Sequence, residues 1–393
     1  MDRPAVPTHD VDLFADDALT DPYPHYRALR DAGPVVWLGA HDVYAVTRFQ
    51  DVRAVLDDAD TFISGQGVGL NDFVNEAGRG TTLMSDGDEH RCQRDIIGRP
   101  LTPRALADLR PDAQALADDL IDRLVTQQTF DGVTDLAEVL PATWVPDLLG
   151  WPDDGRDQLL DWAAATFDGL GPFNARTEAA GIGMLEMSAY AHRLAASELP
   201  ADSFAGRIQA AAAGGEVETT RCPMMITDYL APSLDTTISA IGNALWLFAT
   251  HPEQWQGLRE HPERVKAAFN EALRMETPIN CFTRVAETDT TVDGFTIPAG
   301  ARVLVSYASA NRDERHWDRP DTFDITRESA AHVAFGHGEH ACVGMGLARL
   351  EGAAILSALV ARVERIELAA PPTRKLNNLI RSFGSLPITV TPA

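Results

Sequence analysis

A glycine-rich segment with a single cysteine, placed directly ahead of a long helical pattern, constrains this chain more than any other feature. The segment is Phe335-Gly336-His337-Gly338-Glu339-His340-Ala341-Cys342-Val343-Gly344, and its glycines allow tight backbone turns around the cysteine. The apolar residues that follow have the three-and-four spacing of one buried helix face: Leu347, Leu350, Ala354, Ile355, Ala358 and Leu359. The thiol is therefore expected at a helix amino terminus, where the helix dipole and unpaired N–H groups lower the pKa of a thiol. That is the environment of a metal-binding cysteine.

Helical periodicity dominates the rest of the chain, so we expect a mainly α fold with minor β structure. The longest helical patterns cover 103–124, 223–250 and 262–275. Strand signals cover 35–38 and 43–46, which flank a turn and indicate a hairpin, and later 290–297, 301–306 and 388–390. We expect a β-rich part formed by 30–60 with 285–310 and 375–393. The richest break, 211–215, is short and indicates a loop, so 1–393 is expected to form a single domain.

The charge balance excludes several classes of protein. The chain has 58 acidic and 33 basic residues, a formal net charge of -25, which argues against a nucleic-acid partner. Met1 to Asp17 holds five aspartates and no apolar run, and no later stretch reaches the roughly 18 apolar residues of a membrane helix. The four cysteines show no paired spacing for zinc or disulfides. We expect a cytoplasmic monomer with no membrane contact.

The cysteine segment resembles the haem-ligand loop of cytochromes P450. The matching positions are Phe335, Gly336, Gly338, His340, Cys342 and Gly344. For an isolated cysteine in a glycine-rich turn a merely structural role would be the better interpretation, but six matched positions disfavour it. The resemblance implies the cytochrome P450 fold, haem b as the cofactor, Cys342 as the thiolate ligand of its iron, and His340 as a hydrogen-bond donor to a haem propionate.

Glu271 and Arg274 are three residues apart and share one face of a predicted helix. Alone, such a pair is usually a solvated surface ion pair. Followed by Pro278 and Arg284, it resembles the family's Glu-x-x-Arg helix and the strand after it. The resemblance implies a structural pair that bonds to a downstream meander around 320–327, and it places Arg284 against a haem propionate.

His90 and Arg94 have helical i, i+4 spacing and could together hold an anion. By itself this spacing would indicate only a surface helix. The family has a similar His-x-x-x-Arg pair on the helix over the haem, with both residues contacting propionates, and the order and distance of the motifs fit that pattern.

An acid, two hydroxyls and a proline interrupt the apolar pattern of the predicted 223–250 helix, at 231–237. Pro232 lacks an N–H and bends a helix. Asp235 and Thr236 resemble the family's acid and alcohol pair, which assists proton delivery for O–O cleavage, so the haem is expected between this long kinked central helix and the cysteine loop and helix. Ser233 stands where many members have glycine. Its hydroxyl could touch substrate or bond to the preceding turn.

At Pro232 and Ser233 the sequence is similar to that of bacterial members that oxidise para-substituted benzoates. Residues expected to reach substrate are Arg79, Thr81, Thr82, Phe167, Leu170, Ser233 and Phe282. Arg79 could receive a carboxylate or could be a solvated loop residue. Phe167 and Phe282 could line a pocket or be ordinary core. The expected activity is hydroxylation or oxidative O-demethylation of a small aromatic acid such as a methoxybenzoate. A hydroxylase of a terpenoid or secondary metabolite is the alternative, and a haem sensor without turnover is disfavoured by Asp235 and Thr236.

Electrons must come from other proteins, because the chain has no flavin or nicotinamide fingerprint and no cysteine cluster for iron and sulfur. The resemblance implies a separate ferredoxin and an NAD(P)H-dependent ferredoxin reductase. Arg99 and Arg104 are candidates for a basic docking patch, or are ordinary surface arginines.

Overall fold

The computed structural model describes residues 6–393, which fold mainly into α-helices, as expected. Residues 1–5, part of the acidic amino-terminal segment, lie outside the described residues. The helices are α1 (Asp16–Thr20), α2 (Tyr23–Ala32), α3 (Phe49–Asp57), α4 (Asp72–Ala77), α5 (Gly87–Gly98), α6 (Pro103–Gln127), α7 (Val139–Leu149), α8 (Leu159–Gly169), α9 (Ala175–Ala196), α10 (Phe204–Ala213), α11 (Cys222–Leu230), α12 (Asp235–Thr250), α13 (Pro252–Glu260), α14 (Val265–Met275), α15 (Tyr307–Ala310) and α16 (Met345–Arg362). Along this part of the chain, no helix is both long enough and apolar enough to cross a membrane.

The strands form one larger sheet and three small ones. They are β1 (Thr8–His9), β2 (Val35–Leu38), β3 (Val43–Val46), β4 (Phe62–Ile63), β5 (Thr129–Asp131), β6 (Cys281–Ala286), β7 (Thr290–Val292), β8 (Phe295–Ile297), β9 (Arg302–Ser306), β10 (Val363–Leu368), β11 (Thr373–Leu376), β12 (Arg381–Ser385) and β13 (Pro387–Pro392). The larger sheet has the order β1-β2-β3-β9-β6-β4. Its strand β6 carries Arg284 and packs against α15.

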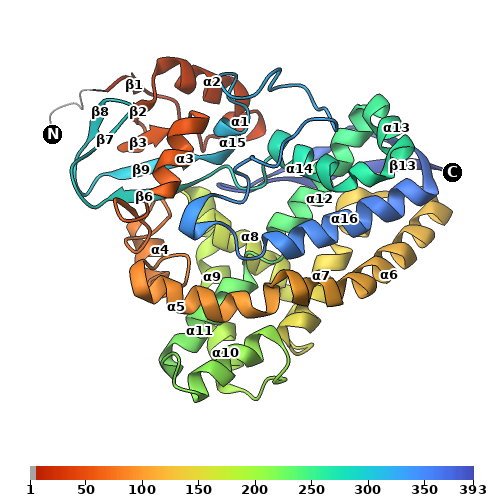
Figure 1. The fold of residues 1–393 in the computed structure, drawn as a ribbon, viewed down its shortest axis with the longest axis horizontal. Helices are drawn as coiled ribbons and strands as arrows, with labels where there is room; N and C mark the ends of the chain where they lie inside the picture. The colour runs from red at the N-terminus through yellow and green to blue at the C-terminus, as the bar shows by residue number, and fades with distance from the viewer. Residues whose placement is uncertain (1–5) are drawn as a thin grey trace.

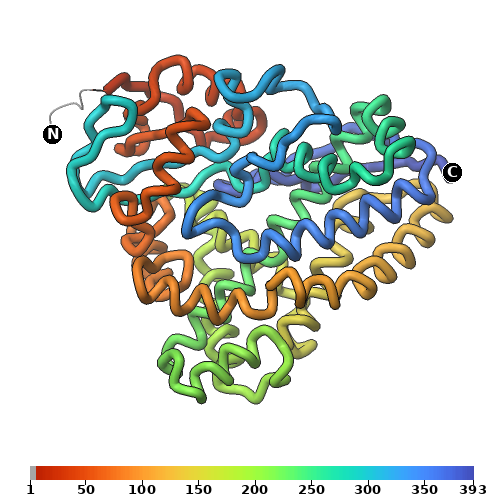
Figure 2. The backbone as a smooth tube through the Cα atoms, in the orientation of Figure 1, coloured from red at the N-terminus to blue at the C-terminus, as the bar shows by residue number. Residues whose placement is uncertain are grey.

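The larger sheet joins segments that are far apart in the sequence. The predicted hairpin is confirmed, because β2 and β3 pair antiparallel with Val35 opposite Val46. Strand β3 also pairs in parallel with β9, with Tyr44 opposite Val303, so the start of the chain lies beside residues after 300 (Figure 2). The predicted strand at 290–297 is instead the β7–β8 hairpin, because Asp293 and Gly294 adopt positive φ angles and turn the chain.

The carboxyl-terminal strands do not join this sheet. Strand β13 pairs with β10 and β5, and β11 pairs with β12, in two separate sheets. The expected grouping of 375–393 with the amino-terminal strands is therefore wrong in this respect. Pairing between strands that are distant in sequence depends on tertiary contacts, which the local strand pattern does not contain.

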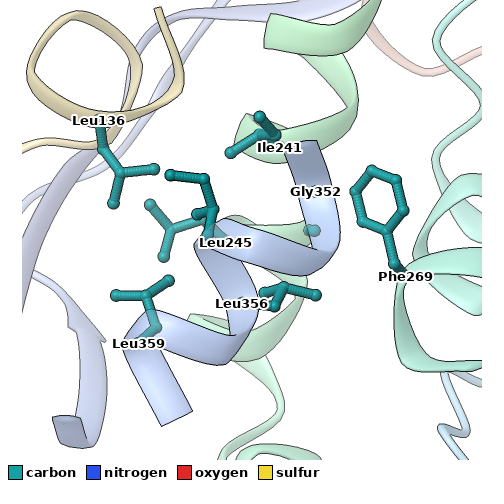
Figure 3. A pocket seen from close by; sticks show the side chains of 9 residues that line it. Leu136, Ile241, Leu245, Phe269, Gly352, Leu356 and Leu359 are labelled. Atoms are coloured by element: carbon teal, nitrogen blue, oxygen red, sulfur yellow. The ribbon is translucent and has the colours of Figure 1, made fainter. Parts of the chain in front are cut away.

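The helical part is built around α12 and α16. Helix α16 packs along α6 and against α12 and α14 (Figure 1). Figure 3 shows the apolar side chains where these helices meet, with Gly352 beside Phe269. A Cβ on Gly352 would lie 2.2 Å from the Phe269 ring, so glycine at this position lets the two helices approach. This packing fixes the direction of α16 and hence the position of Cys342 at its start.

The predicted helix over 223–250 is two helices. Helix α11 ends at Leu230 and α12 begins at Asp235, with turns between them. Pro232 has no N–H to continue the helical ladder. The Ser233 hydroxyl donates to the carbonyl of Tyr229 in the last turn of α11, and the Thr236 hydroxyl donates to the carbonyl of Pro232 inside the break. The expected long kinked helix is therefore interrupted over four residues rather than bent. Helical periodicity continues across this break, which is why the sequence pattern did not reveal it.

Candidate active site

A cavity of about 380 Å³ lies between the cysteine loop and the α11–α12 break. Cys342 and Thr236 both line it. Further walls come from α5, α8, α9 and the loop at 78–84. The cavity thus brings together residues that the sequence analysis drew from distant motifs.

The loop that carries Cys342 is held in shape by its glycines. Gly336 and Gly338 have φ angles of +70° and +68°, a conformation that L side chains rarely adopt. A Cβ on Gly338 would also lie 2.3 Å from the carbonyl oxygen of Leu56. The Cys342 N–H donates to the carbonyl of Phe335 at 2.8 Å, which closes the loop. Phe335, Gly336, Cys342 and Gly344 all line the cavity, and Gly344 is the N-cap residue of α16.

The pKa of the Cys342 thiol is raised, not lowered. Burial disfavours the thiolate, and the backbone N–H groups of Gly344 and Met345 offset only part of this effect. The predicted effect of the helix amino terminus is present, because those amides favour the thiolate, but burial outweighs it and the expected net lowering is wrong. A bound metal ion is what deprotonates a thiol in such a setting.

Four cationic or imidazole side chains line the same cavity: His90, Arg94, Arg284 and His340. Arg94 donates to the carbonyl of Ala341, and the His90 Nδ1 lies 2.8 Å from a Glu339 carboxylate oxygen. Arg284 donates to the carbonyl of Thr283 at 2.8 Å. The Nε2 atom of His340 is buried and has no hydrogen-bond partner among the described residues. This wall of donors around a cysteine fits a haem, since the two propionates would supply the acceptors.

The predicted structural role of Glu271 and Arg274 is confirmed. The two side chains form a salt bridge at 2.8 Å and are fully buried. Arg274 also donates to the carbonyl of Pro320 at 2.8 Å and to that of Thr322 at 3.3 Å. Arg327 completes the contact with Glu271 at 3.1 Å. The pair therefore fastens α14 to the meander around 320–327 that leads to the cysteine loop.

Asp235 and Thr236 lie in the first turn of α12, and Thr236 lines the cavity. The Thr236 hydroxyl donates to the carbonyl of Pro232 at 2.8 Å. The Oδ2 atom of Asp235 is buried without a hydrogen-bond partner among the described residues, and burial raises its pKa while Lys375 lowers it. The two groups are thus a hydroxyl in the cavity wall and, directly before it, a buried carboxyl able to hold a proton.

Comparison with known proteins agrees with this geometry. Residues 208–387 match the family model described as cytochrome P450. Cytochrome P450 CYP199A2 of Rhodopseudomonas palustris is 40% identical over 99% of this chain and 95% of its own length. This chain belongs to the cytochrome P450 family. Members carry haem b with a cysteine ligand, so haem b is the cofactor and the protein is a mono-oxygenase of the oxidoreductase class.

Two further P450 proteins share lower identity with this chain over most of its length. The beta-dihydromenaquinone-9 omega-hydroxylase of Mycobacterium tuberculosis is 31% identical over 98% of this chain and 79% of its own. Cytochrome P450 CREJ in complex with (4-ethylphenyl) dihydrogen phosphate superposes with a TM-score of 0.87 at 26% identity, covering 95% of this chain and 98% of that one. Bacterial P450 enzymes generally use redox partners and act on small molecules.

Six of the seven predicted substrate residues line the P450 cavity: Thr81, Thr82, Phe167, Leu170, Ser233 and Phe282. The Ser233 hydroxyl donates to the carbonyl of Tyr229, so of the two interpretations left open it takes the bond to the preceding turn. Phe167 and Phe282 are both buried and both face the cavity.

Arg79 is the exception among the predicted substrate residues. It pairs with Glu76 at 2.7 Å, and its side chain is 59% exposed. Arg79 is not part of the cavity wall, because this local ion pair and solvent hold the guanidinium at the surface. Arg79, which was expected to bind the substrate carboxylate, is therefore outside the pocket.

Sequence reasoning missed four ionisable residues in the cavity wall, Asp228, Tyr229, Tyr307 and Glu351. Burial raises the pKa of Asp228 to about 6 and that of Glu351 to about 8. For Asp228 the sequence shows an acid in a largely apolar helical segment, which does not by itself place the side chain in a cavity.

The two arginines considered for partner docking lie in different settings. Arg99 pairs with Asp95 at 2.7 Å and with Glu216 at 2.6 Å, so its charge is locally balanced. Arg104, near the start of α6, makes no ion pair within 6–393. Arg104 therefore remains the candidate for an unbalanced positive charge on this surface.

Proposed function

We propose that this P450 hydroxylates or oxidatively O-demethylates a small, planar aromatic acid such as a methoxybenzoate. The observation that carries the proposal is that Cys342 and Thr236 line one cavity whose walls also include two aromatic rings, Phe167 and Phe282. The hydroxyl-bearing residues Thr81 and Thr82 line the same cavity. An apolar pocket with a few placed polar groups is typical of a small-molecule site.

The haem would be held by side chains that already converge on the cavity. Cys342 would ligate the iron, and His90, Arg94, Arg284 and His340 would bind the propionates. When bound, the haem supplies activation of dioxygen for insertion of one oxygen atom into the substrate. Because the loop fixes the position of Cys342, it also fixes where in the cavity the haem iron would be held.

Phe167 and Phe282 would hold an aromatic ring from two sides. Phe282 is fixed in turn by Tyr307, whose ring lies edge-on with a centroid distance of 6.0 Å. Aromatic walls favour a flat substrate because stacked and edge-on contacts add to the burial of apolar area. The bound (4-ethylphenyl) dihydrogen phosphate in the CREJ structure is a para-substituted benzene carrying an anionic group, which supports this substrate class.

Asp235 and Thr236 would deliver protons. The Asp235 carboxyl is buried, and burial raises its pKa, which favours the protonated form. The Thr236 hydroxyl donates its single hydrogen to the carbonyl of Pro232, so it would turn that hydrogen into the cavity to deliver a proton and would then regain one by way of Asp235. For a methoxyarene the reaction consumes dioxygen, two electrons and two protons, and gives the phenol, formaldehyde and water.

The electrons would come from a ferredoxin and its NAD(P)H-dependent reductase. The sequence carries no flavin, nicotinamide or iron–sulfur motif of its own. Bacterial members of the family generally rely on such separate redox partners.

A terpenoid or secondary-metabolite hydroxylase is the second candidate. The rim of the cavity supports it, because Phe73 and Leu185 line the cavity and yet are 70% and 68% exposed. An elongated apolar substrate could cover both side chains. One relative is named beta-dihydromenaquinone-9 omega-hydroxylase, and that name describes a larger apolar substrate.

The decisive experiment is a titration of the purified ferric protein with 4-methoxybenzoate, following the Soret band for the low-to-high-spin change. A saturable change, followed by equimolar 4-hydroxybenzoate and formaldehyde under turnover, is the expected result. If haem-loaded protein gives no response to this or related benzoates but responds to terpenoids, the second candidate replaces the first.

A further inference from the structure

One carboxyl in the cavity wall has no part in haem binding or proton delivery as described above. Asp228, in α11, lines the cavity, and its Oδ2 accepts a hydrogen bond from the Thr82 N–H at 2.8 Å. The residue is surrounded by protein, yet its side chain keeps some accessible surface, because that surface faces the cavity. A carboxylate has about four acceptor positions, so the bond to Thr82 leaves capacity for a donor on a ligand.

The position of Asp228 suits contact with the far end of a small aromatic substrate. Asp228 lies in α11, before the break at 231–234, and Thr236 lies in the first turn of α12, after it, and both line the same cavity. A para-substituted benzene whose reacting group lies near Thr236 would place its other substituent close to Asp228 and Thr82. The residue is thus a candidate for contact with the polar head group of the substrate.

The surroundings of Asp228 control its charge. Burial raises its pKa to about 6, while the amides of Thr82 and Leu83 and the guanidinium of Arg94 lower it. The other titratable side chains that line the cavity are His90 and Arg94 from α5, Tyr229 from α11, Arg284 from β6, Tyr307 from α15, His340 and Cys342 from the cysteine loop, and Glu351 from α16. Of these, Arg94 is the cation that acts on Asp228, and its own hydrogen bond goes to Ala341.

We propose that Asp228 selects substrates by the charge of their polar head group. It accepts a hydrogen bond from a neutral or cationic head, and it admits a carboxylate head only together with one proton. The inference rests on the proposed function, because it states how that aromatic pocket chooses among substrates of the same shape.

The reason is electrostatic. Two carboxylates in contact inside a protein cannot both stay ionised, so the pair retains one proton. Above the pKa of free Asp228, binding of a benzoate then takes up a proton from solution, and each unit of pH weakens binding about tenfold. A neutral amide needs no such proton, and a cationic amidinium gains a charge-assisted hydrogen bond.

The test uses three ligands of one shape: 4-methoxybenzoate, 4-methoxybenzamide and 4-methoxybenzamidinium. Each is titrated into ferric holoenzyme at about pH 6 and about pH 8, values on either side of neutrality where benzoate stays ionised and amidinium stays protonated. The readout is the dissociation constant from the spin-state change. The amide does not ionise, so it reports any effect of pH on the other groups of the site.

The variant is Asp228→Asn, whose amide oxygen can still accept from Thr82. The matched control is Asp168→Asn. Asp168, in α8, also has a pKa raised to about 6 and also accepts from a backbone N–H, that of Asn378, but it does not line the cavity. Both variants are checked for the haem-thiolate spectrum of the reduced carbon monoxide complex before use.

In the wild type we expect benzoate binding to weaken about tenfold or more over this interval, while amide binding stays constant. In Asp228→Asn the pH dependence for benzoate should vanish and amidinium affinity should fall about tenfold. Asp168→Asn should behave as wild type. Benzoate binding that is independent of pH and unchanged in Asp228→Asn would overturn the inference and leave the aromatic pocket intact. The absence of a spin change with all three ligands would overturn the proposed function and this inference together.

Discussion

Arg274 lies one helical turn after Glu271 in α14 and meets both of its carboxylate oxygens at 2.8 Å, with neither side chain exposed to solvent. Arg274 reaches onward to the carbonyls of Asn311 and Pro320, and Arg327 reaches back to Glu271. One buried ion pair therefore ties a helix to two segments of irregular backbone. Those segments lead into the loop of Cys342, which connects this pair to the haem site.

Glu271→Gln should strongly destabilise the protein. Removing one charge of a buried pair leaves the other uncompensated, which costs about 3–5 kcal/mol. The free energy of unfolding, measured by denaturant titration with circular dichroism, should fall by that amount, and haem retention should fall with it. Arg91→Ala, which breaks the exposed pair with Asp88, is the control and should leave stability unchanged. A Glu271→Gln protein as stable as wild type would show that the pair is not needed to hold the meander.

Glu276 should contribute stability that is lost in acid. Its carboxylate contacts Arg381, Arg374 and Arg312 at 2.6, 2.9 and 3.1 Å, and these arginines hold its pKa down to about 2 despite burial. A group with a lowered folded-state pKa stabilises the fold above its ordinary pKa and stops doing so as pH falls through the folded value.

The measurement is the difference in unfolding free energy between wild type and Glu276→Gln as a function of pH. The pH-dependent part of that difference should be about 3 kcal/mol, and it should shrink as the pH is lowered from about 4.5 towards about 2. A constant difference over that interval would mean that the carboxylate is not specially stabilised by its arginines.

Much of the site could be predicted from local sequence because its motifs are local. His90 with Arg94, Glu271 with Arg274, and the loop before α16 each depend on residues within one or two turns of backbone. The structure places His90, Arg94 and the cysteine loop on one cavity and fastens Glu271 and Arg274 to the predicted meander. Spacing along a helix fixes which side chains share a face, whereas the resemblance to the cytochrome P450 family assigned these pairs to the haem and to the meander.

The parts that could not be predicted depend on contacts between distant segments. Arg79 belongs to the expected loop but pairs with its neighbour Glu76 at the surface, and only the packing of that loop decides this. Asp228 is a site residue because α11 meets the loop of Thr82, whose N–H donates to the Asp228 carboxylate, and this contact joins segments that are distant in sequence. The break at Pro232 was hidden because the apolar spacing continues on both sides of it. The pKa of Cys342 depends on how much protein surrounds the sulfur, which the sequence does not give.

Cys342→Ser should abolish the haem-thiolate character of the protein. A serine hydroxyl lacks the soft sulfur donor that supports O–O cleavage. The reduced carbon monoxide complex should lose the spectrum that is typical of thiolate ligation, and mono-oxygenase activity should disappear while the helical circular dichroism is retained. Cys92→Ser is the control, because Cys92 is exposed on α5 and lies outside the cavity wall. Retention of the thiolate spectrum in Cys342→Ser would assign the ligand to another cysteine.

Thr236→Ala should uncouple electron consumption from product formation. The hydroxyl stands in the cavity wall, one residue after the buried Asp235 carboxyl, so under the proposed function its loss slows proton delivery to the bound reactants. Product per NAD(P)H should fall by on the order of tenfold and hydrogen peroxide should rise, with the substrate-induced spin change preserved. Thr250→Ala is a matched control in the same helix, since its hydroxyl also donates to the carbonyl four residues back, that of Trp246 at 2.8 Å, but does so far from the cavity. Unchanged coupling in Thr236→Ala would remove this hydroxyl from the proton route.

Arg79→Ala should leave the binding of 4-methoxybenzoate unchanged within about twofold, as expected for an exposed ion pair. The guanidinium is more than half exposed and already paired with Glu76, so a substrate carboxylate gains little from it. This expectation is opposite to the one that the sequence alone allowed, in which Arg79 anchors the carboxylate. The comparison with Asp228→Asn is informative, because that variant changes a charge inside the cavity and Arg79→Ala changes one outside it. The dissociation constant from the spin-state titration, measured at low and at moderate ionic strength, separates the two cases. A tenfold loss of benzoate affinity in Arg79→Ala at moderate ionic strength would show that the 78–84 loop moves inward when substrate binds, and that Arg79 exchanges Glu76 for the substrate carboxylate.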